Sequence, residues 1–356
     1  MTENIKNKSI FSKVNNFNII RLLAAFQVVV FHTIHHLDIQ AEWILGLNNS
    51  FLKYFPGVPI FFFISGFLIF WSFQRNSTDI NKFFKNRVLR IFPALWVCLL
   101  ITIFLIFLAS ENFNLLITDK QFYIWLIGQL SFFQFYTPEI LRFWGVGTPN
   151  GSLWTIVVEL QFYLLIPVLS YFINRRKPYI FIILILSVLA NIYIGSLNSE
   201  IIIRKLGAVF VFPYLYYFIF GVLTFIYWDY IVPFVQNKFL LWLLFYVLWN
   251  FYFDVFLEIE TYSYWVDSPI NLLSDILLLG FTFSAATSYN TLSAKLLKGV
   301  DISYGVYIYH MLIINLFITY GLVGNSYYLL IVLVLVTLIS YLSWILIEKP
   351  FLNMKN

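Results

Sequence analysis

Charged side chains are scarce in this sequence of 356 residues, which has 22 Lys and Arg and 17 Asp and Glu. They make up 11% of the chain, whereas a soluble domain carries about 25% because water must wet its surface. This scarcity excludes a soluble enzyme, a disordered chain and a nucleic-acid-binding protein with a basic face. Cysteine is also rare, and the single Cys98 excludes an intramolecular disulfide and a multi-cysteine metal site.

Hydrophobic side chains dominate instead, at 61% of the residues. A helix needs about 20 apolar residues to cross a hydrocarbon core of about 30 Å. Ten runs satisfy this requirement, at residues 18–37, 56–73, 91–109, 153–173, 178–196, 208–228, 239–257, 269–288, 302–323 and 328–347. We therefore predict an all-α integral membrane protein with about ten transmembrane helices.

An eleventh apolar run, residues 121–136, is short and rich in aromatic residues and glutamine. Ten spans with a cytoplasmic N-terminus place 17 basic side chains inside and 5 outside, as the positive-inside rule requires. If 121–136 also crossed, the division would be 12 against 10. We therefore predict that both termini are cytoplasmic and that 121–136 is an interfacial or re-entrant helix on the outer side. Residues 1–356 are expected to form one membrane-embedded domain without an appended soluble domain.

The first span contains two ionisable side chains, Arg21 and His32, which are eleven residues apart. Eleven helical residues rise about 16 Å and return to nearly the same face. An arginine at the inner surface and a histidine at depth suit a channel that takes an anionic cofactor from the cytoplasm. The pair is equally typical of an arginine that reaches lipid headgroups and a histidine that bonds to a neighbouring helix.

Two further arginines, Arg87 and Arg90, precede the third span and are spaced to share a helix face. Forked guanidinium donors suit phosphates better than lysines do. Charge counting alone favours the simpler interpretation, in which the two side chains anchor the helix to lipid phosphates.

Three more ionisable side chains, Glu159, Asp275 and His310, lie inside other spans. A buried carboxylate must be paired or protonated, and His32 or His310 are candidate partners. An acid and an imidazole in one cavity are the components of general acid–base catalysis. They are also the components of a proton relay in a transporter, and the residue types alone do not separate the two.

His35 and His36 follow His32 at helical spacing, as metal ligands often do. The same helix offers no further ligand except Asp38, near its outer end. We therefore interpret the two histidines as polar residues at the outer mouth and predict no metal.

Several segments together resemble the acyltransferase 3 family of integral-membrane O-acyltransferases. The first span is similar to that family's signature of an arginine and a histidine separated by ten residues, here Arg21 and His32. The segment from Gly57 to Ser65 and Gly66 resembles its second-helix motif, in which an acid often occupies the position of Pro59.

Three later segments extend the resemblance over residues 18–351. Arg87 and Arg90 match the family's Arg-x-x-Arg motif. The segment from Ser152 to Tyr163 resembles a motif with paired glutamates, although Leu160 follows Glu159 here. A late element with serine, tyrosines and histidine is matched by Ser303, Tyr304, Tyr309 and His310.

The resemblance implies O-acyl transfer, commonly of acetyl from acetyl-CoA, to a hydroxyl of a cell-surface or lipid-linked glycan. It implies a location in the bacterial cytoplasmic membrane, and a stand-alone enzyme of the kind linked to O-antigen, capsule or exopolysaccharide. No nucleic acid, metal or redox cofactor is expected.

The resemblance also suggests roles for individual residues. The donor phosphates are expected to bind Arg87 and Arg90, with Arg21 as a further candidate. His32 is expected to act as general base on the acceptor hydroxyl or to carry the acyl group transiently. Glu159 is expected to orient the imidazole or to bind the acceptor. Oxyanion donors are expected among three cavity residues, Ser65, Tyr304 and His310.

A transporter or flippase for a lipid-linked glycan is the main alternative, with His32, Glu159, Asp275 and His310 as a proton relay. Inverted repeats would favour a transporter, and the sequence shows none. The arginines near the inner surface favour a phosphorylated donor. A glycan polymerase needs a larger outer surface than residues 110–152 provide, and a structural scaffold would not need ionisable residues at depth.

Overall fold

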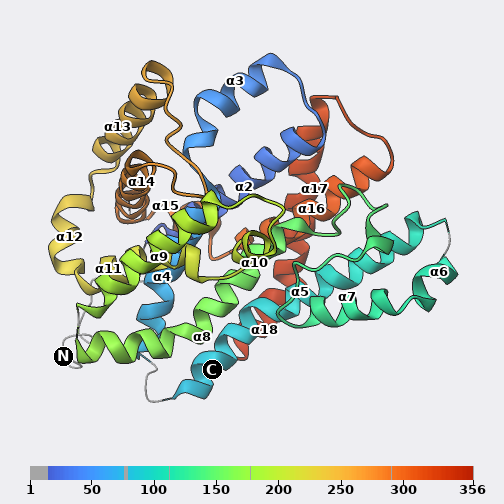
Figure 1. Cartoon of the computed structure of the whole chain (residues 1–356), viewed down its shortest axis with the longest axis horizontal. Helices are drawn as coiled ribbons and strands as arrows, with labels where there is room; N and C mark the ends of the chain where they lie inside the picture. Colours follow the sequence, from blue (N-terminus) through green and yellow to red (C-terminus); the bar gives the residue numbers. More distant parts are fainter. Residues whose placement is uncertain (1–14, 76–78, 112, 177, 290, 356) are drawn as a thin grey trace. The chain divides into compact units, whose positions relative to one another are not determined.

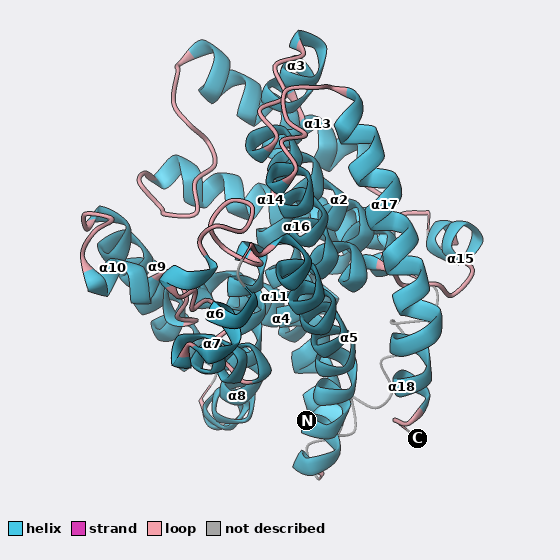
Figure 2. Cartoon of the chain, turned by 90° about the vertical axis from the view of Figure 1, so that its right-hand side faces the viewer, coloured by secondary structure: helices cyan, strands magenta, loops and turns pink. Residues whose placement is uncertain are grey.

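The computed structural model describes residues 15–75, 79–111, 113–176, 178–289 and 291–355. Helices and loops account for all of these residues, and no strand occurs among them (Figure 2). The predicted all-α fold is therefore confirmed.

The apolar runs predicted from the sequence form helices. Within the described residues, eight helical segments are long and apolar enough to cross a membrane: Phe17–His36, Glu42–Arg75, Ile80–Ala109, Gly151–Arg175, Tyr179–Ser196, Phe239–Phe256, Pro269–Thr287 and Tyr327–Asn353. Two helices, Phe212–Ile226 and Trp228–Val235, make a further pair that is bent by 95°. The ninth run, residues 302–323, forms a shorter apolar helix, Ser303–Thr319. The chain is a multi-pass membrane protein, and the cytoplasmic position of its termini stays a prediction.

Figure 1 labels most of the elements along the chain. The first part of the chain contains α2 (Phe17–His36), α3 (Glu42–Ser50), η1 (Leu52–Tyr54), α4 (Gly57–Arg75), α5 (Ile80–Ala109), α6 (Phe113–Thr118), α7 (Lys120–Leu130), η2 (Glu139–Leu141), η3 (Gly151–Leu153), α8 (Trp154–Arg175) and α9 (Tyr179–Ser196). The second part contains α10 (Ile202–Gly207), η4 (Phe212–Tyr214), α11 (Leu215–Ile226), α12 (Trp228–Val235), α13 (Phe239–Asn250), η5 (Phe251–Phe256), α14 (Pro269–Thr287), α15 (Leu292–Leu297), α16 (Ser303–Thr319), α17 (Tyr327–Ser343), η6 (Trp344–Glu348) and α18 (Lys349–Asn353).

The described chain divides into two compact units, each built from separate stretches of sequence. The first unit contains the residues up to Ala24, together with Lys53–Phe83 and Val158–Gly299. The second unit contains Ala25–Leu52, Phe84–Val157 and the residues from Val300 onward. Helices α2, α5 and α8 each pass from one unit into the other. That residues 1–356 act as one membrane-embedded domain stays a prediction.

The first unit is organised around the close approach of α4 and α11. A Cβ atom on Gly66 would lie 2.1 Å from the carbonyl oxygen of Phe218, and one on Gly221 would lie 2.1 Å from that of Phe63. Small residues let two helix backbones pack this tightly inside a membrane, where van der Waals contact drives association. The packing thus explains why glycine follows Ser65 on α4.

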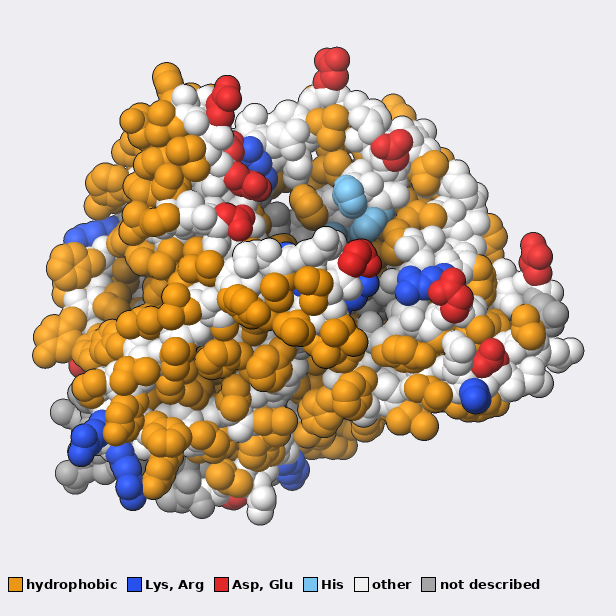
Figure 3. Space-filling model, in the orientation of Figure 1, with side chains coloured by type: hydrophobic (Ala, Val, Ile, Leu, Met, Phe, Trp, Pro, Cys, Tyr) orange, Lys and Arg blue, Asp and Glu red, His pale blue; other side chains and the backbone are white. Residues whose placement is uncertain are grey.

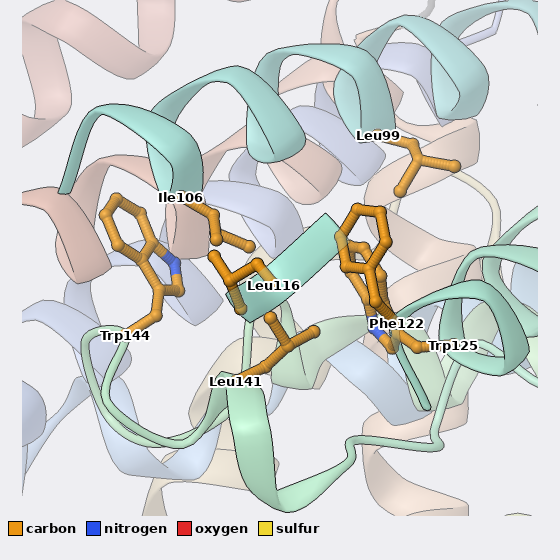
Figure 4. Close-up of a cluster of buried hydrophobic side chains, with 7 residues drawn as sticks. All are labelled: Leu99, Ile106, Leu116, Phe122, Trp125, Leu141 and Trp144. Atoms are coloured by element: carbon orange, nitrogen blue, oxygen red, sulfur yellow. The ribbon is translucent and has the colours of Figure 1, made fainter. Parts of the chain in front are cut away.

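The second unit contains a hydrophobic cluster to which the short helix α7 contributes Phe122 and Trp125 (Figure 4). Its members are Leu99, Ile106, Leu116, Phe122, Trp125, Leu141 and Trp144. Helix α7 has 11 residues, so it rises only about 16 Å and is too short to cross a bilayer. Gln129, the last residue but one of α7, is buried and donates a hydrogen bond to the carbonyl oxygen of Gln134, which closes the turn that follows the helix. The prediction that 121–136 does not span is confirmed, and its interfacial position stays a prediction.

Candidate active site

Two histidines on different helices of the second unit are hydrogen-bonded to each other. Nδ1 of His32 on α2 lies 2.8 Å from Nε2 of His310 on α16. Nδ1 of His310 lies 2.6 Å from the carbonyl oxygen of Tyr307, one turn earlier on the same helix. His310 has an exposed fraction of 0%, and His32 is half-buried. The arrangement thus presents one imidazole whose partner is entirely sequestered from solvent.

Tyr307 is in turn held by residues at the start of α8. Its hydroxyl lies 2.7 Å from Oγ1 of Thr155 and donates to the carbonyl oxygen of Ser152 at 3.2 Å. Asn150 reaches the next carbonyl of α16, that of Ile308, at 2.8 Å. The segment that carries the Ser152–Trp154 motif therefore fixes the part of α16 that bears His310.

The other two histidines lie toward the surface. His35 is exposed and His36 is half-buried, and the rings of His32 and His36 are 5.5 Å apart. Figure 3 shows histidine side chains on the molecular surface, amid the hydrophobic side chains that cover much of that face. Within the described part of the chain, no group of three histidine, cysteine or acidic side chains is placed to hold a metal ion.

A cluster of positive charge lies at the N-terminal end of α5, also in the second unit. Arg90 donates to the carboxylate of Asp301 at 3.0 Å, and Arg87 is half-buried one turn earlier. Burial, together with the charges of Arg90 and Arg87, lowers the pKa of the Lys355 amine to about 7. Three basic side chains thus lie near one another, and one of them, Arg90, is paired with a carboxylate. Guanidinium groups of this kind suit a multiply charged anion.

Glu159 lies in the first unit, where two hydroxyl groups hold its carboxylate. Ser65 donates to Oε1 at 3.0 Å, and Tyr163, one turn later on α8, donates to the same oxygen at 2.5 Å. The hydrogen bond that orients His32 comes from His310 and not from this carboxylate. A direct role of Glu159 in the reaction stays a prediction.

The remaining predicted residues fall at separate places. Arg21 is half-buried on α2, the continuous helix that also carries His32. Tyr304 donates its hydroxyl proton to the carbonyl oxygen of Ile91 at 3.0 Å, so that proton is already used. Asp275 is buried in the first unit and accepts from Tyr216 at 3.1 Å, so its partner is a tyrosine and not a histidine.

The second unit therefore brings together His32 with His310, and Arg87 with Arg90, whereas Ser65 meets Glu159 in the first unit. Sequence reasoning missed Asp301 and Lys355. Asp301 had a local signal, because an acid two residues before Ser303 is typical of a helix start. Lys355 had none, since its neighbours come from α5, far away in the sequence.

Comparison with known proteins supplies the family. The acyltransferase domain known as acyltransferase 3 matches residues 14–345. Nodulation protein 10 of Rhizobium leguminosarum bv. viciae is 31% identical over 366 residues, covering 96% of this chain and 94% of the relative. An O-acetyl transferase of Shigella phage Sf6 is 29% identical, covering 96% of this chain and 97% of the relative.

A third relative matches only in part. O-acetyltransferase OatA of Staphylococcus aureus strain NCTC 8325 is 30% identical over 177 residues, which cover 45% of this chain and 25% of that protein. No solved structure matches the chain.

Proposed function

The chain belongs to the acyltransferase 3 family and is a membrane O-acyltransferase, and from that premise we propose its donor, its acceptor and its catalytic base. The donor is acetyl-CoA from the cytoplasm, and the acceptor is a hydroxyl of a cell-surface or lipid-linked glycan. The enzyme acts in the bacterial cytoplasmic membrane. The observation that carries this proposal is the hydrogen bond between His32 and His310, because it provides an oriented imidazole on a membrane helix.

His32 is the general base of the proposed reaction. It takes the proton of the acceptor hydroxyl as the oxygen bonds to the acyl carbon, and gives that proton to the leaving thiolate of CoA when the carbon–sulfur bond breaks. A positioned base of this kind accelerates a reaction by roughly 10²–10⁴-fold. An acyl group carried transiently on His32 is the second route, and it uses the same ring nitrogen.

The cations at the N-terminal end of α5 suit the phosphates of the proposed donor. Arg87 and Arg90 present guanidinium groups on one part of α5, and the amine of Lys355 lies close enough to feel both charges. The lowered pKa of Lys355 comes first from burial and then from the charges of Arg90 and Arg87, which supports the proximity of the three groups. We assign Arg87 and Arg90 to donor binding and leave Arg21 as a further candidate on α2.

Transfer of label tests the catalytic assignment. Membranes that contain wild type, His32→Ala or His35→Ala at matched amounts are incubated with radiolabelled acetyl-CoA and host surface glycan. Label is expected to reach the glycan with wild type and with His35→Ala, whose side chain is exposed on the same helix. Wild-type transfer by His32→Ala would overturn the assignment. Label that stays on the wild-type protein after rapid quenching would identify the acyl-histidine route.

Binding of CoA tests the donor site separately. Arg87→Gln is expected to weaken CoA binding by about tenfold or more, as the loss of a charge-assisted hydrogen bond predicts. Lys85→Gln is the matched control, because Lys85 is exposed on the same turn of α5. If wild type does not bind CoA, the proposed donor is wrong.

A further inference from the structure

We propose that His310 is a positioning residue that holds His32 in the tautomer with its proton on Nδ1 and its lone pair on Nε2. This inference rests on the proposed role of His32 as base. It assigns His310 a task different from oxyanion stabilisation, because both of its ring nitrogens already have partners.

The tautomer of His310 follows from its contact with the backbone. A carbonyl oxygen can only accept, so Nδ1 of His310, 2.6 Å from the oxygen of Tyr307, must carry a proton. A neutral imidazole has one N–H, which leaves a lone pair on Nε2. His310 is neutral because it is fully buried, and an unpaired buried cation is costly. Within the described residues, no carboxylate hydrogen-bonds to either ring.

The tautomer of His32 follows from that of His310. Since Nε2 of His310 can only accept, Nδ1 of His32 at 2.8 Å must donate. The ring centroids are 5.1 Å apart and the ring planes are inclined by 21°. This separation is much longer than that of the bonded nitrogens, so the rings meet edge to edge in nearly one plane. The lone pair of His32 is therefore on Nε2, on the opposite side of the ring from His310.

The same contact also favours the charged intermediate. When His32 takes a proton from the acceptor it becomes an imidazolium, and its Nδ1–H donates a stronger, charge-assisted hydrogen bond to His310. His310 provides this stabilisation without a negative charge, whose burial in a membrane costs free energy. The hydroxyl contacts of Tyr307 with Thr155 and Ser152 keep the carbonyl that orients His310 in place.

Two substitutions at position 310 separate positioning from packing. His310→Leu removes the acceptor, and we expect turnover to fall by about 10²-fold with CoA binding unchanged. His310→Gln retains a side-chain oxygen that can accept from Nδ1 of His32, so we expect it to recover most of the turnover. Wild-type turnover by a folded His310→Leu protein would overturn the proposal. So would equal loss in both variants with their folds and CoA binding intact.

Nitrogen-15 NMR of the protein in lipid nanodiscs determines the tautomer of His32 and does not depend on enzymatic turnover. The chain has 4 histidines, so each resonance can be assigned by single substitution. His32 is expected to show the Nδ1–H tautomer in wild type and in His310→Gln, and the mixture typical of free imidazole in His310→Leu. An Nε2–H tautomer of His32 in wild type would overturn the proposal. Label transfer by His32→Ala would instead defeat the proposed function, so the two failures are distinguishable.

Discussion

Arg90 and Asp301 form an ion pair of 3.0 Å that joins the N-terminal end of α5 to the start of α16. The exposed fractions of the two side chains are 27% and 8%. The other carboxylate oxygen of Asp301 accepts from the hydroxyl of Ser303 at 2.6 Å, at the first residue of α16. The proposed donor site is thereby tied to the helix that carries His310.

Loss of this ion pair is expected to destabilise the protein. Arg90→Gln leaves the carboxylate of Asp301 buried without its charged partner, which costs roughly 1–3 kcal/mol. We expect a lower melting temperature in detergent, together with weaker CoA binding. Arg142→Gln is the control, because its ion pair with Glu139 is exposed and contributes little. Equal melting temperatures for the two variants would contradict the expected cost.

CoA binding is expected to depend on pH through Lys355. With a pKa of about 7, its amine is charged below that pH and neutral above it, so affinity for an anion falls as the pH rises. Lys355→Met removes the titrating group, and its affinity is expected to stay constant or to rise, because phosphate gains charge over the same range. Titration calorimetry at about pH 6 and about pH 8 measures the CoA affinity of wild type and of Lys355→Met.

The amine of Lys355 also makes the stability of the fold depend on pH, but in the opposite direction to CoA affinity. Its folded pKa lies below its unfolded value of 10.5, so the unfolded chain binds more protons between these two values. The free energy of unfolding should therefore rise with pH across that window, and this rise should be smaller in Lys355→Met. A CoA affinity that changes with pH in the same way in wild type and in Lys355→Met would exclude Lys355 from the donor site.

Glu159 can be tested without disturbing its surroundings. In Glu159→Gln the hydroxyls of Ser65 and Tyr163 can still donate to the amide oxygen, so the melting temperature should not change. If the carboxylate acts in the reaction, turnover should fall by about 10²-fold or more. Glu139→Gln, at an exposed position, serves as the control. Unchanged turnover in Glu159→Gln would limit this carboxylate to a structural role.

The contact between α4 and α11 gives a test of the fold. Gly66→Ala places a methyl group against the carbonyl of Phe218, where a backbone and not a flexible side chain must move. Overpacking of this kind typically costs about 1–3 kcal/mol. Gly46→Ala is the matched control, because no atom lies within 4 Å of its added Cβ. We expect a lower melting temperature for Gly66→Ala than for Gly46→Ala. Equal melting temperatures would contradict the tight contact between α4 and α11.

Hydropathy predicted the helices well because it is a local property of the chain. Each predicted run became a helix, and the short segment after Lys120 was recognised as one that does not cross. The bend of 95° between α11 and α12 was not predicted. The predicted run, residues 208–228, ends at the break, and hydropathy carries no information on the direction in which α12 continues.

The candidate residues were found by type, but their partners were not. His32 and His310 were recognised as ionisable groups at membrane depth, and their mutual hydrogen bond was not predicted. Glu159 was expected near a histidine, and the structure gives it Ser65 and Tyr163. A type of residue at a given depth has several possible neighbours, and helix rotation and packing select among them.

The sequence by itself determined that this chain lies in a membrane, because 11% charge cannot cover a soluble particle of its size. It also determined which ionisable side chains lie within apolar spans, where each needs a partner because its burial costs free energy. Only the tertiary structure decided that His310 accepts from His32 and that Asp301 accepts from Arg90. Such bonds join residues hundreds of positions apart, and they exist only after packing has brought separate helices within hydrogen-bonding distance.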